Sequence, residues 1–137
     1  MQADSLARAA ISALDDIKAR DISVLDVRRL TSLFDTVIVA SAESGRQTKA
    51  LARHLQDKAK ELGAHIYGVE GEDSGEWVLV DLGDVVVHIM QPAVRDYYNL
   101  EELWGGRRPL PGRTAGGARA GTDPVANPVG LALREDR

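Results

Sequence analysis

The sequence of 137 residues contains no cysteine and no long apolar run. Without cysteine the chain can form no disulfide and has no thiolate for catalysis or metal binding. This absence suits a protein of the reducing cytoplasm. No apolar stretch approaches the roughly 20 residues that span a membrane as a helix, and the first residues lack the apolar core of a signal peptide. We therefore expect a cytoplasmic protein with no membrane partner.

Sequence signatures of catalysis are missing as well. The chain has no nucleophile elbow, no P-loop and no glycine-rich dinucleotide fingerprint. Its histidines, His54, His65 and His88, are not arranged at metal-ligand spacing. The sequence thus predicts no catalytic residue, no metal site and no cofactor.

Two acidic residues keep an enzymatic alternative open. Asp81 and Asp84 flank the end of a strand, and two carboxylates on one strand face can hold Mg²⁺ for nucleotidyl transfer. Such a pair needs a spacing of two residues, whereas this spacing is three. We expect Asp84 to form a turn instead. A Mg-dependent, nucleotidyltransferase-like enzyme remains one alternative, and a generic protein-binding adaptor is another.

The junction at 41–47 offers a second, weaker chemical possibility. A strand, a serine-containing loop and a helix N-terminus follow one another there, and the free N–H groups of such a terminus can hold a phosphate. The loop has one glycine and lacks the Gly-Lys-Ser of a P-loop. We favour an ordinary helix start, in which Ser44 and Gln47 form a capping box.

The charge is unevenly distributed along the chain. Residues 1–104 carry 11 lysines and arginines against 18 acids, and residues 105–137 carry 6 arginines against 3 acids. An acidic body argues against nucleic acid as its main partner. It favours a basic protein partner, because complementary fields speed encounter. The arginines of the basic tail could touch phosphate, but we expect a solvated tail.

The stretch 76–92 predicts a β-hairpin with a two-residue turn at Gly83-Asp84. One face of the hairpin is aliphatic and is predicted to be core. The other face carries Trp77, Leu79 and Asp81 opposite Met90, His88 and Val86, and we expect helices to cover it only partly. The predicted register of the aliphatic face pairs Leu82 with Val85, Val80 with Val87, and Val78 with Ile89.

Hydrophobic periodicity predicts the remaining elements. Helices are expected from Asp4 or Ser5 onward, from Ser44 to Leu62, and over 93–104, with strands at 22–27, 34–40 and 65–69. The last helix is predicted to bury Val94, Tyr97, Leu100 and Trp104, with Tyr98 on its flank. The last 33 residues contain 7 glycines and 4 prolines, so 105–137 is predicted to be a disordered tail after one domain at 1–104.

Two aromatic residues are candidates for partner contact. Trp77 follows an acidic turn, and Tyr98 lies on the last helix, which starts where the hairpin ends. They are expected to border one patch, edged by Asp81 and Glu102. Large aromatics often carry most of the energy of an interface. The alternative for Trp77 is packing in the core against Met90.

Several stretches together resemble one known family. Gly-Glu-Trp-Val-Leu-Val-Asp-Leu-Gly-Asp-Val-Val-Val-His-Ile-Met at 75–90 and Arg-Asp-Tyr-Tyr-Asn-Leu-Glu-Glu-Leu-Trp at 95–104 look like the ribosomal silencing factor (RsfS, Iojap) family. Leu-Asp-Val-Arg-Arg-Leu-Thr-Ser-Leu-Phe-Asp at 25–35 and Ser-Gly-Arg-Gln-Thr-Lys-Ala at 44–50 fit the same pattern. The resemblance covers roughly residues 3–104.

The resemblance implies an α/β fold with a mixed five-stranded sheet flanked by helices, like that of nucleotidyltransferases but without their catalytic signature. It implies a non-enzymatic repressor that binds the large ribosomal subunit at its ribosomal protein fourteen. Binding there would block joining of the small subunit and so damp translation when nutrients are short. It also implies a homodimer when free. On such a particle the basic tail is expected to make at most a minor contact with ribosomal RNA. The partner-facing residues carried over are Trp77, Asp81, Asp84 and Tyr98.

Overall fold

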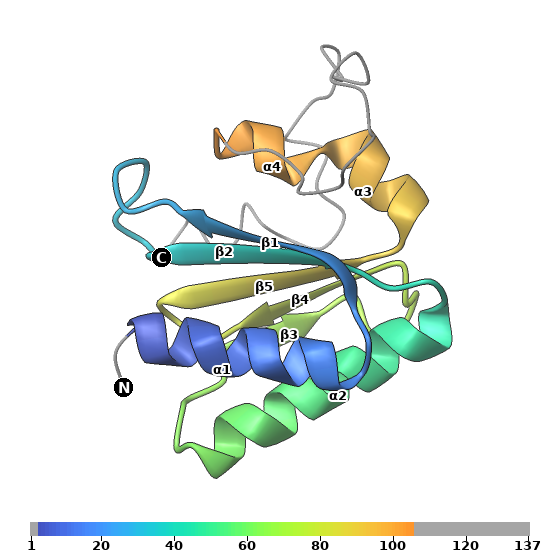
Figure 1. The fold of residues 1–137 in the computed structure, drawn as a ribbon, viewed down its shortest axis with the longest axis horizontal. Coiled ribbons are helices and arrows are strands. Elements are labelled where there is room, and N and C mark those ends of the chain that lie inside the picture. The colour runs from blue at the N-terminus through green and yellow to red at the C-terminus, as the bar shows by residue number, and fades with distance from the viewer. Residues whose placement is uncertain (1–2, 106–137) are drawn as a thin grey trace.

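The computed structural model describes residues 3–105, which form one five-stranded sheet between two helical layers (Figure 1). Nearly all of the predicted tail therefore lies outside the described residues. The helices are α1 (Ala3–Asp16), α2 (Gly45–Glu61), α3 (Pro92–Tyr98) and α4 (Leu100–Leu103). The strands are β1 (Arg20–Asp26), β2 (Thr36–Ser41), β3 (Gly68–Glu70), β4 (Trp77–Asp81) and β5 (Val85–Met90).

The strands lie in the order β1-β2-β5-β4-β3. Only β2 and β5 run parallel, and the other neighbours are antiparallel. The predicted mixed sheet flanked by helices is thus confirmed. Helices α1 and α2 cover one face, while α3 and α4 lie over the other (Figure 1). None of the helices within 3–105 combines the length and the apolar character needed to cross a membrane.

The β4–β5 hairpin has the predicted register. Val80 pairs with Val87 and Val78 pairs with Ile89. Gly83 takes the left-handed backbone conformation, with φ 92°, which L side chains rarely adopt. A Cβ at Gly83 would also come within 2.7 Å of Tyr67 Cε2. Glycine is therefore required at this turn by both conformation and space.

The core has two parts, one on each face of the sheet. The part beneath α1 and α2 is aliphatic and includes Leu14, Leu51, Val80 and Ile89. The part beneath α3 and α4 combines valines with larger side chains, among them Phe34, Trp77, Leu79, Met90 and Leu100.

The expectation that the second face is only partly covered is wrong for most of its length. Trp77, Leu79, His88 and Met90 are all buried, and only Asp81 is half-buried. The reason is that the segment after β5 folds back over the sheet and the loop after β1 brings Phe34 to the same side.

The last helix is interrupted, in contrast to the single helix predicted over 93–104. Asn99 adopts a left-handed conformation with φ 48°, and its N–H donates to the carbonyl of Arg95. This is a helix C-terminal geometry that asparagine tolerates better than most residues. The chain then turns into α4, so the side chains before and after Asn99 no longer follow one helical stripe.

The predicted start of α2 is confirmed. Ser44 is the N-cap, and its Oγ accepts a hydrogen bond of 3.0 Å from the backbone N–H of Gln47. The Gln47 side chain accepts from the backbone N–H of Glu43, at 2.7 Å. Its amide also donates to the carbonyls of Ile17 and Lys18. Gln47 therefore ties the start of α2 to the segment between α1 and β1, in addition to its capping role.

Candidate partner-binding groove

A surface groove of about 590 Å³ lies between the turn before β4 and helix α3. Its wall on the turn side is acidic and polar, and its wall on the helix side is apolar and aromatic. The lining residues are Gly71, Asp73, Ser74, Glu76, Trp77, Ala93, Val94, Tyr97 and Tyr98. Two of the four residues expected to face a partner, Trp77 and Tyr98, are therefore brought together here.

Three aromatic rings run from the core to the surface of this groove. The Trp77 ring is 1% exposed and lies 4.9 Å, centroid to centroid, from the half-buried ring of Tyr98. Tyr98 in turn lies 4.9 Å from Tyr97, edge to face, a favoured arrangement for aromatic pairs. Tyr97 is 64% exposed. Tyr97 therefore offers the exposed aromatic surface, and Trp77 supports it from beneath through Tyr98.

Sequence periodicity placed these tyrosines the other way round. It predicted Tyr97 in the buried stripe and Tyr98 on the flank, whereas Tyr98 packs on the core and Tyr97 is exposed. The buried position of α3 belongs to Arg95. The prediction assumed one straight helix through Leu100 and Trp104, and the break at Asn99 invalidates that assumption.

The buried end of the aromatic series is held by His88. The indole Nε1 of Trp77 donates a hydrogen bond of 3.0 Å to Nδ1 of His88. Burial lowers the pKa of His88 from 6.5 to about 3, because charging the ring in this environment would require removing an ion from water. The ring is therefore neutral near pH 7, with its proton on Nε2. His88 is thus a core residue, with 0% exposure.

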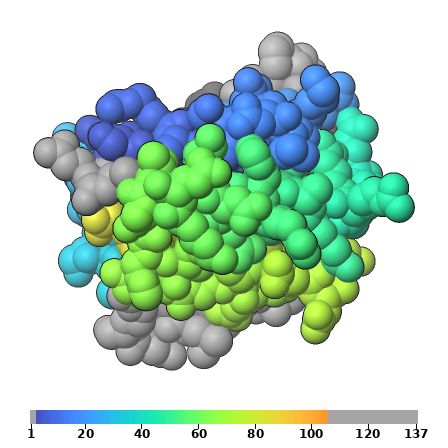
Figure 2. All heavy atoms as spheres, turned by 90° about the horizontal axis from the view of Figure 1, so that it is seen from below, coloured from blue at the N-terminus to red at the C-terminus, as the bar shows by residue number. Residues whose placement is uncertain are grey.

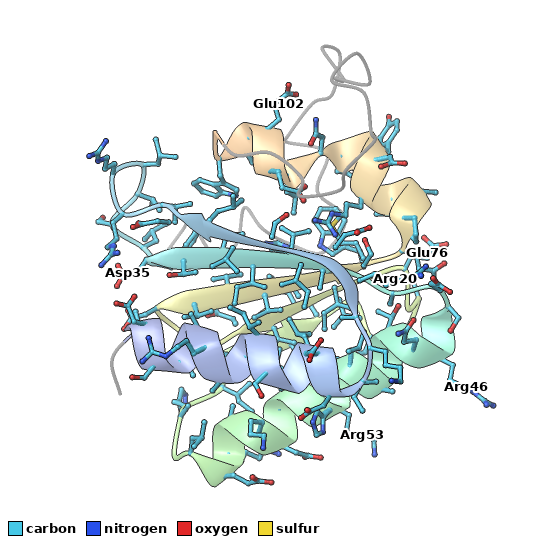
Figure 3. All side chains as sticks on the ribbon, viewed as in Figure 1. Arg20, Asp35, Arg46, Arg53, Glu76 and Glu102 are labelled. Atoms are coloured by element: carbon cyan, nitrogen blue, oxygen red, sulfur yellow. The ribbon has the colours of Figure 1, made fainter. Side chains whose placement is uncertain are left out.

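The acidic side chains of the groove wall are in no ion pair within residues 3–105. Asp73 and Glu76 are exposed, and neither takes part in an ion pair there. Figure 3 shows Glu76 reaching outward near the start of α2. A groove with aromatic and carboxylate walls is suited to a segment that presents lysine or arginine beside apolar groups.

Asp81 and Asp84 lie at the opposite end of the hairpin. Four residues of extended strand, about 13 Å, separate Trp77 from Asp81. Asp81 Oδ1 accepts a 2.9 Å hydrogen bond from the N–H of Gly83. The carbonyl of Asp84 accepts from the N–H groups of Asp35 and Thr36. The side-chain turn role expected of Asp84 thus belongs to Asp81.

The predicted edge of the patch also differs. Glu102 is exposed on α4 but does not line the groove, and in Figure 3 it points away from the sheet. Within residues 3–105, no three histidine, cysteine, aspartate or glutamate side chains are grouped closely enough to hold a metal ion.

Sequence reasoning did not identify a buried polar network that positions α3. The Arg95 guanidinium donates to Ser41 Oγ at 2.8 Å, to Ser23 Oγ at 2.9 Å, and to the carboxylate of Glu101. Ser23 Oγ also donates to Glu101, at 3.0 Å. The network connects α3 and α4 to strands β1 and β2. It therefore holds the helix that carries Tyr97 and Tyr98 over the sheet.

Comparison with known proteins agrees with this architecture. A family model described as "Ribosomal silencing factor during starvation" matches residues 1–126. A ribosomal silencing factor RsfS of Chromobacterium violaceum is 59% identical over 109 residues, which are 80% of this chain and 89% of that protein. The RsfS of Bacillus subtilis is 43% identical over 105 residues, 77% of this chain and 89% of that protein.

A solved structure supports the same assignment. The crystal structure of a Chromobacterium violaceum protein superposes with a TM-score of 0.78 at 56% identity, covering 84% of this chain and 96% of that one. The family description denotes a regulatory factor of the ribosome rather than an enzyme. From fold, sequence and the extent of the match together, the chain belongs to the ribosomal silencing factor family.

Proposed function

We propose that the chain binds the large ribosomal subunit through its ribosomal protein fourteen and thereby sterically blocks joining of the small subunit. Translation would be repressed in this way when nutrients are limiting. The mechanism needs only occupancy of the intersubunit face and no chemical step. The proposal rests on membership of the silencing factor family and on the resemblance of 75–90 and 95–104 to the family pattern.

The main structural support for the proposed contact with the ribosomal protein is the groove at Tyr97. An exposed tyrosine, backed by Tyr98 and buried Trp77, stands opposite the carboxylates of Asp73 and Glu76. Proteins that bind ribosomal RNA need basic side chains to neutralise phosphates. A basic segment of such a protein would place its cations against the acidic wall and its apolar stems against the tyrosines.

The carried-over residues have unequal parts in this proposal. Both Tyr98 and Trp77 line the groove, but Trp77 is almost fully buried and would act mainly by supporting Tyr98. Asp81 and Asp84 would have to make a second contact, because they lie at the turn end of the hairpin. We further propose that the free chain is a homodimer and works in the cytoplasm. Sedimentation equilibrium of the purified chain tests the dimer.

The proposed mechanism is tested by titrating the full chain into separated ribosomal subunits and resolving the products on a sucrose gradient. We expect the chain to comigrate with large subunits and to reduce joined ribosomes in proportion to the large subunits occupied. Comigration with small subunits would contradict the proposed target. Inactivation of many subunits by one chain would contradict steric exclusion and support an enzyme.

A further inference from the structure

Positive charge in this acidic domain is concentrated on one helix. Helix α2 holds five of the eleven lysines and arginines of residues 1–104, but only two of the eighteen acids. The helix therefore has a net charge of +3, against −10 for the remainder of residues 1–104. A basic helix on an acidic body can attract a negatively charged partner only if its cations share one exposed face.

Four of these cations do share a face, which we call the α2 ridge: Arg46, Lys49, Arg53 and Lys60. All four are exposed, and their spacings of three, four and seven residues keep them on one side of a helix. The opposite side packs Leu51, Leu55 and Ala59 into the core. Arg46 and Arg53 extend away from the body (Figure 3). The ridge is about 21 Å long, at about 1.5 Å per residue.

The ridge cations are not neutralised by neighbouring carboxylates. Elsewhere within residues 3–105, cations do find partners, as in Arg20–Glu43, Arg28–Asp26 and Lys58–Glu61. None of the ion pairs in this part of the chain involves a ridge residue. One acid, Asp57, lies along the ridge between Arg53 and Lys60, which leaves the ridge with a net charge of +3.

The ridge begins at the edge of the groove. A Cβ added to Gly75 would lie 3.3 Å from Cε of Lys49, so the Lys49 side chain runs beside the turn that forms the acidic wall. Seen from below, α2 spans the middle of its face of the molecule, beside α1 (Figure 2). A partner segment in the groove would therefore lie close to Lys49, near the start of α2.

We propose that the α2 ridge binds phosphates of ribosomal RNA on the large subunit, next to the protein that occupies the groove. This inference rests on the proposed function, which places the chain on a particle rich in RNA. The ridge gives an acidic domain a local attraction for that RNA. In this proposal Arg46, Lys49, Arg53 and Lys60 contact the phosphate backbone of the RNA. Such contacts position the protein on the RNA without reading the base sequence.

The exposed chemistry of α2 favours RNA over an acidic protein surface. Between the ridge cations, the only exposed apolar residue is Ala50, whereas protein interfaces have an apolar or aromatic centre. Phosphate contacts need no such centre, because the free energy comes from release of counterions. Evenly distributed long cations without an apolar patch therefore match a phosphate backbone better.

The measurement is the affinity of the full chain for large subunits between 50 and 200 mM KCl. Each phosphate contact contributes about 0.9 to the slope of log affinity against log salt, so four ridge contacts predict a loss of about 150-fold across this range. Arg46→Ala/Arg53→Ala should reduce the loss to about 12-fold. The matched control, Arg8→Ala/Arg29→Ala, removes the same charge from exposed sites on α1 and the β1–β2 loop and should keep the wild-type slope.

A second arm separates this inference from the proposed function. The same three proteins are tested on protein-free large-subunit RNA at low salt, where docking in the groove plays no part. The ridge variant should bind this RNA more weakly than both wild type and control. If the ridge variant binds the RNA more weakly than wild type but none of the three proteins binds large subunits, the proposed function is contradicted. The RNA-binding role of the α2 ridge would then still hold.

Three results would overturn the inference. In the first, wild type and the ridge variant have the same salt slope and the same RNA affinity. In the second, ridge and control variants lose affinity equally, so that only overall charge matters. In the third, the salt slope on large subunits depends on the ridge but wild type does not bind the RNA, which would point to an acidic protein instead.

Discussion

Trp77 and His88 are joined across strands β4 and β5 by a buried hydrogen bond of 3.0 Å from the indole Nε1 to the imidazole Nδ1. The two residues occupy diagonal positions on one face of the hairpin, because Trp77 pairs with Met90 and His88 pairs with Leu79. The indole donates its only N–H in this bond, and Nδ1 can accept it only when the imidazole is neutral. Protonation of His88 would therefore break the bond that holds Trp77 beneath Tyr98.

The first prediction concerns stability in mild acid. The pKa of folded His88, about 3, is below the ordinary value of 6.5, so between these values the unfolded chain binds a proton that the folded chain does not. The contribution of His88 is complete above pH 6.5 and is lost as the pH falls toward 3. At pH 5 the loss is about 2 kcal/mol. Urea unfolding of wild type and His88→Gln at pH 7 and pH 5 measures it. The variant should change less with pH, and equal changes would contradict the prediction.

The second prediction separates core from interface at Trp77. Because the ring is 1% exposed, Trp77→Ala should lower the free energy of unfolding by about 3–5 kcal/mol. Trp77→Phe keeps most of the volume but leaves His88 Nδ1 without its donor, so we expect a smaller loss of about 1–3 kcal/mol. Thermal melts compare the two. A normal melting temperature for Trp77→Ala, together with lost binding, would instead establish a direct partner contact.

The third prediction concerns Tyr97 as the exposed contact. Tyr97→Ala should weaken comigration with large subunits by roughly thirtyfold, which corresponds to about 2 kcal/mol for a lost aromatic contact. Its melting temperature should hardly change. Tyr67→Ala is the matched control, because Tyr67 is 54% exposed and lies beside the hairpin turn rather than the groove. Equal binding by both variants would show that Tyr97 is not a contact.

The fourth prediction concerns the Arg95–Glu101 pair. Arg95→Met leaves a buried carboxylate without its cation and should cost about 3–5 kcal/mol. Replacing both partners, as in Arg95→Met/Glu101→Leu, should recover much of this loss, since no uncompensated charge remains. A double-mutant cycle by urea unfolding measures the coupling. Additive losses in the double variant would show that the two side chains do not act as a pair.

The fifth prediction concerns residues 106–137. The last element of the described structure ends at Leu103, so a chain ending at Gly105 should keep the melting temperature of the full chain. Removing the six arginines of this segment should weaken binding to large subunits only at low salt. Early melting of the shortened chain would show that these residues pack against the domain.

Local chemistry determined a large part of this fold before any tertiary contact was known. The hairpin register followed from one glycine turn and the alternation of side chains around it, because a strand has a period of two residues. The start of α2 followed from Ser44 and Gln47, which make their capping bonds within a few residues. Family membership was also readable, because long stretches of the pattern lie close together in sequence.

The candidate site depended on contacts between distant residues. A left-handed Asn99 is compatible with the sequence but not required by it, and it ends the single helix on which the predicted positions of Tyr97 and Tyr98 were based. Arg95 finds two of its partners in Ser41 and Ser23, more than fifty residues away along the chain, so no local pattern could identify its buried position. The sequence by itself determined the hairpin register, the N-cap of α2 and the charge of each helix, because these depend on neighbours along the chain. It placed the third strand at 65–69, whereas β3 spans Gly68–Glu70. Only the tertiary structure decided which aromatic is exposed and where the groove lies, because burial depends on what folds over each face.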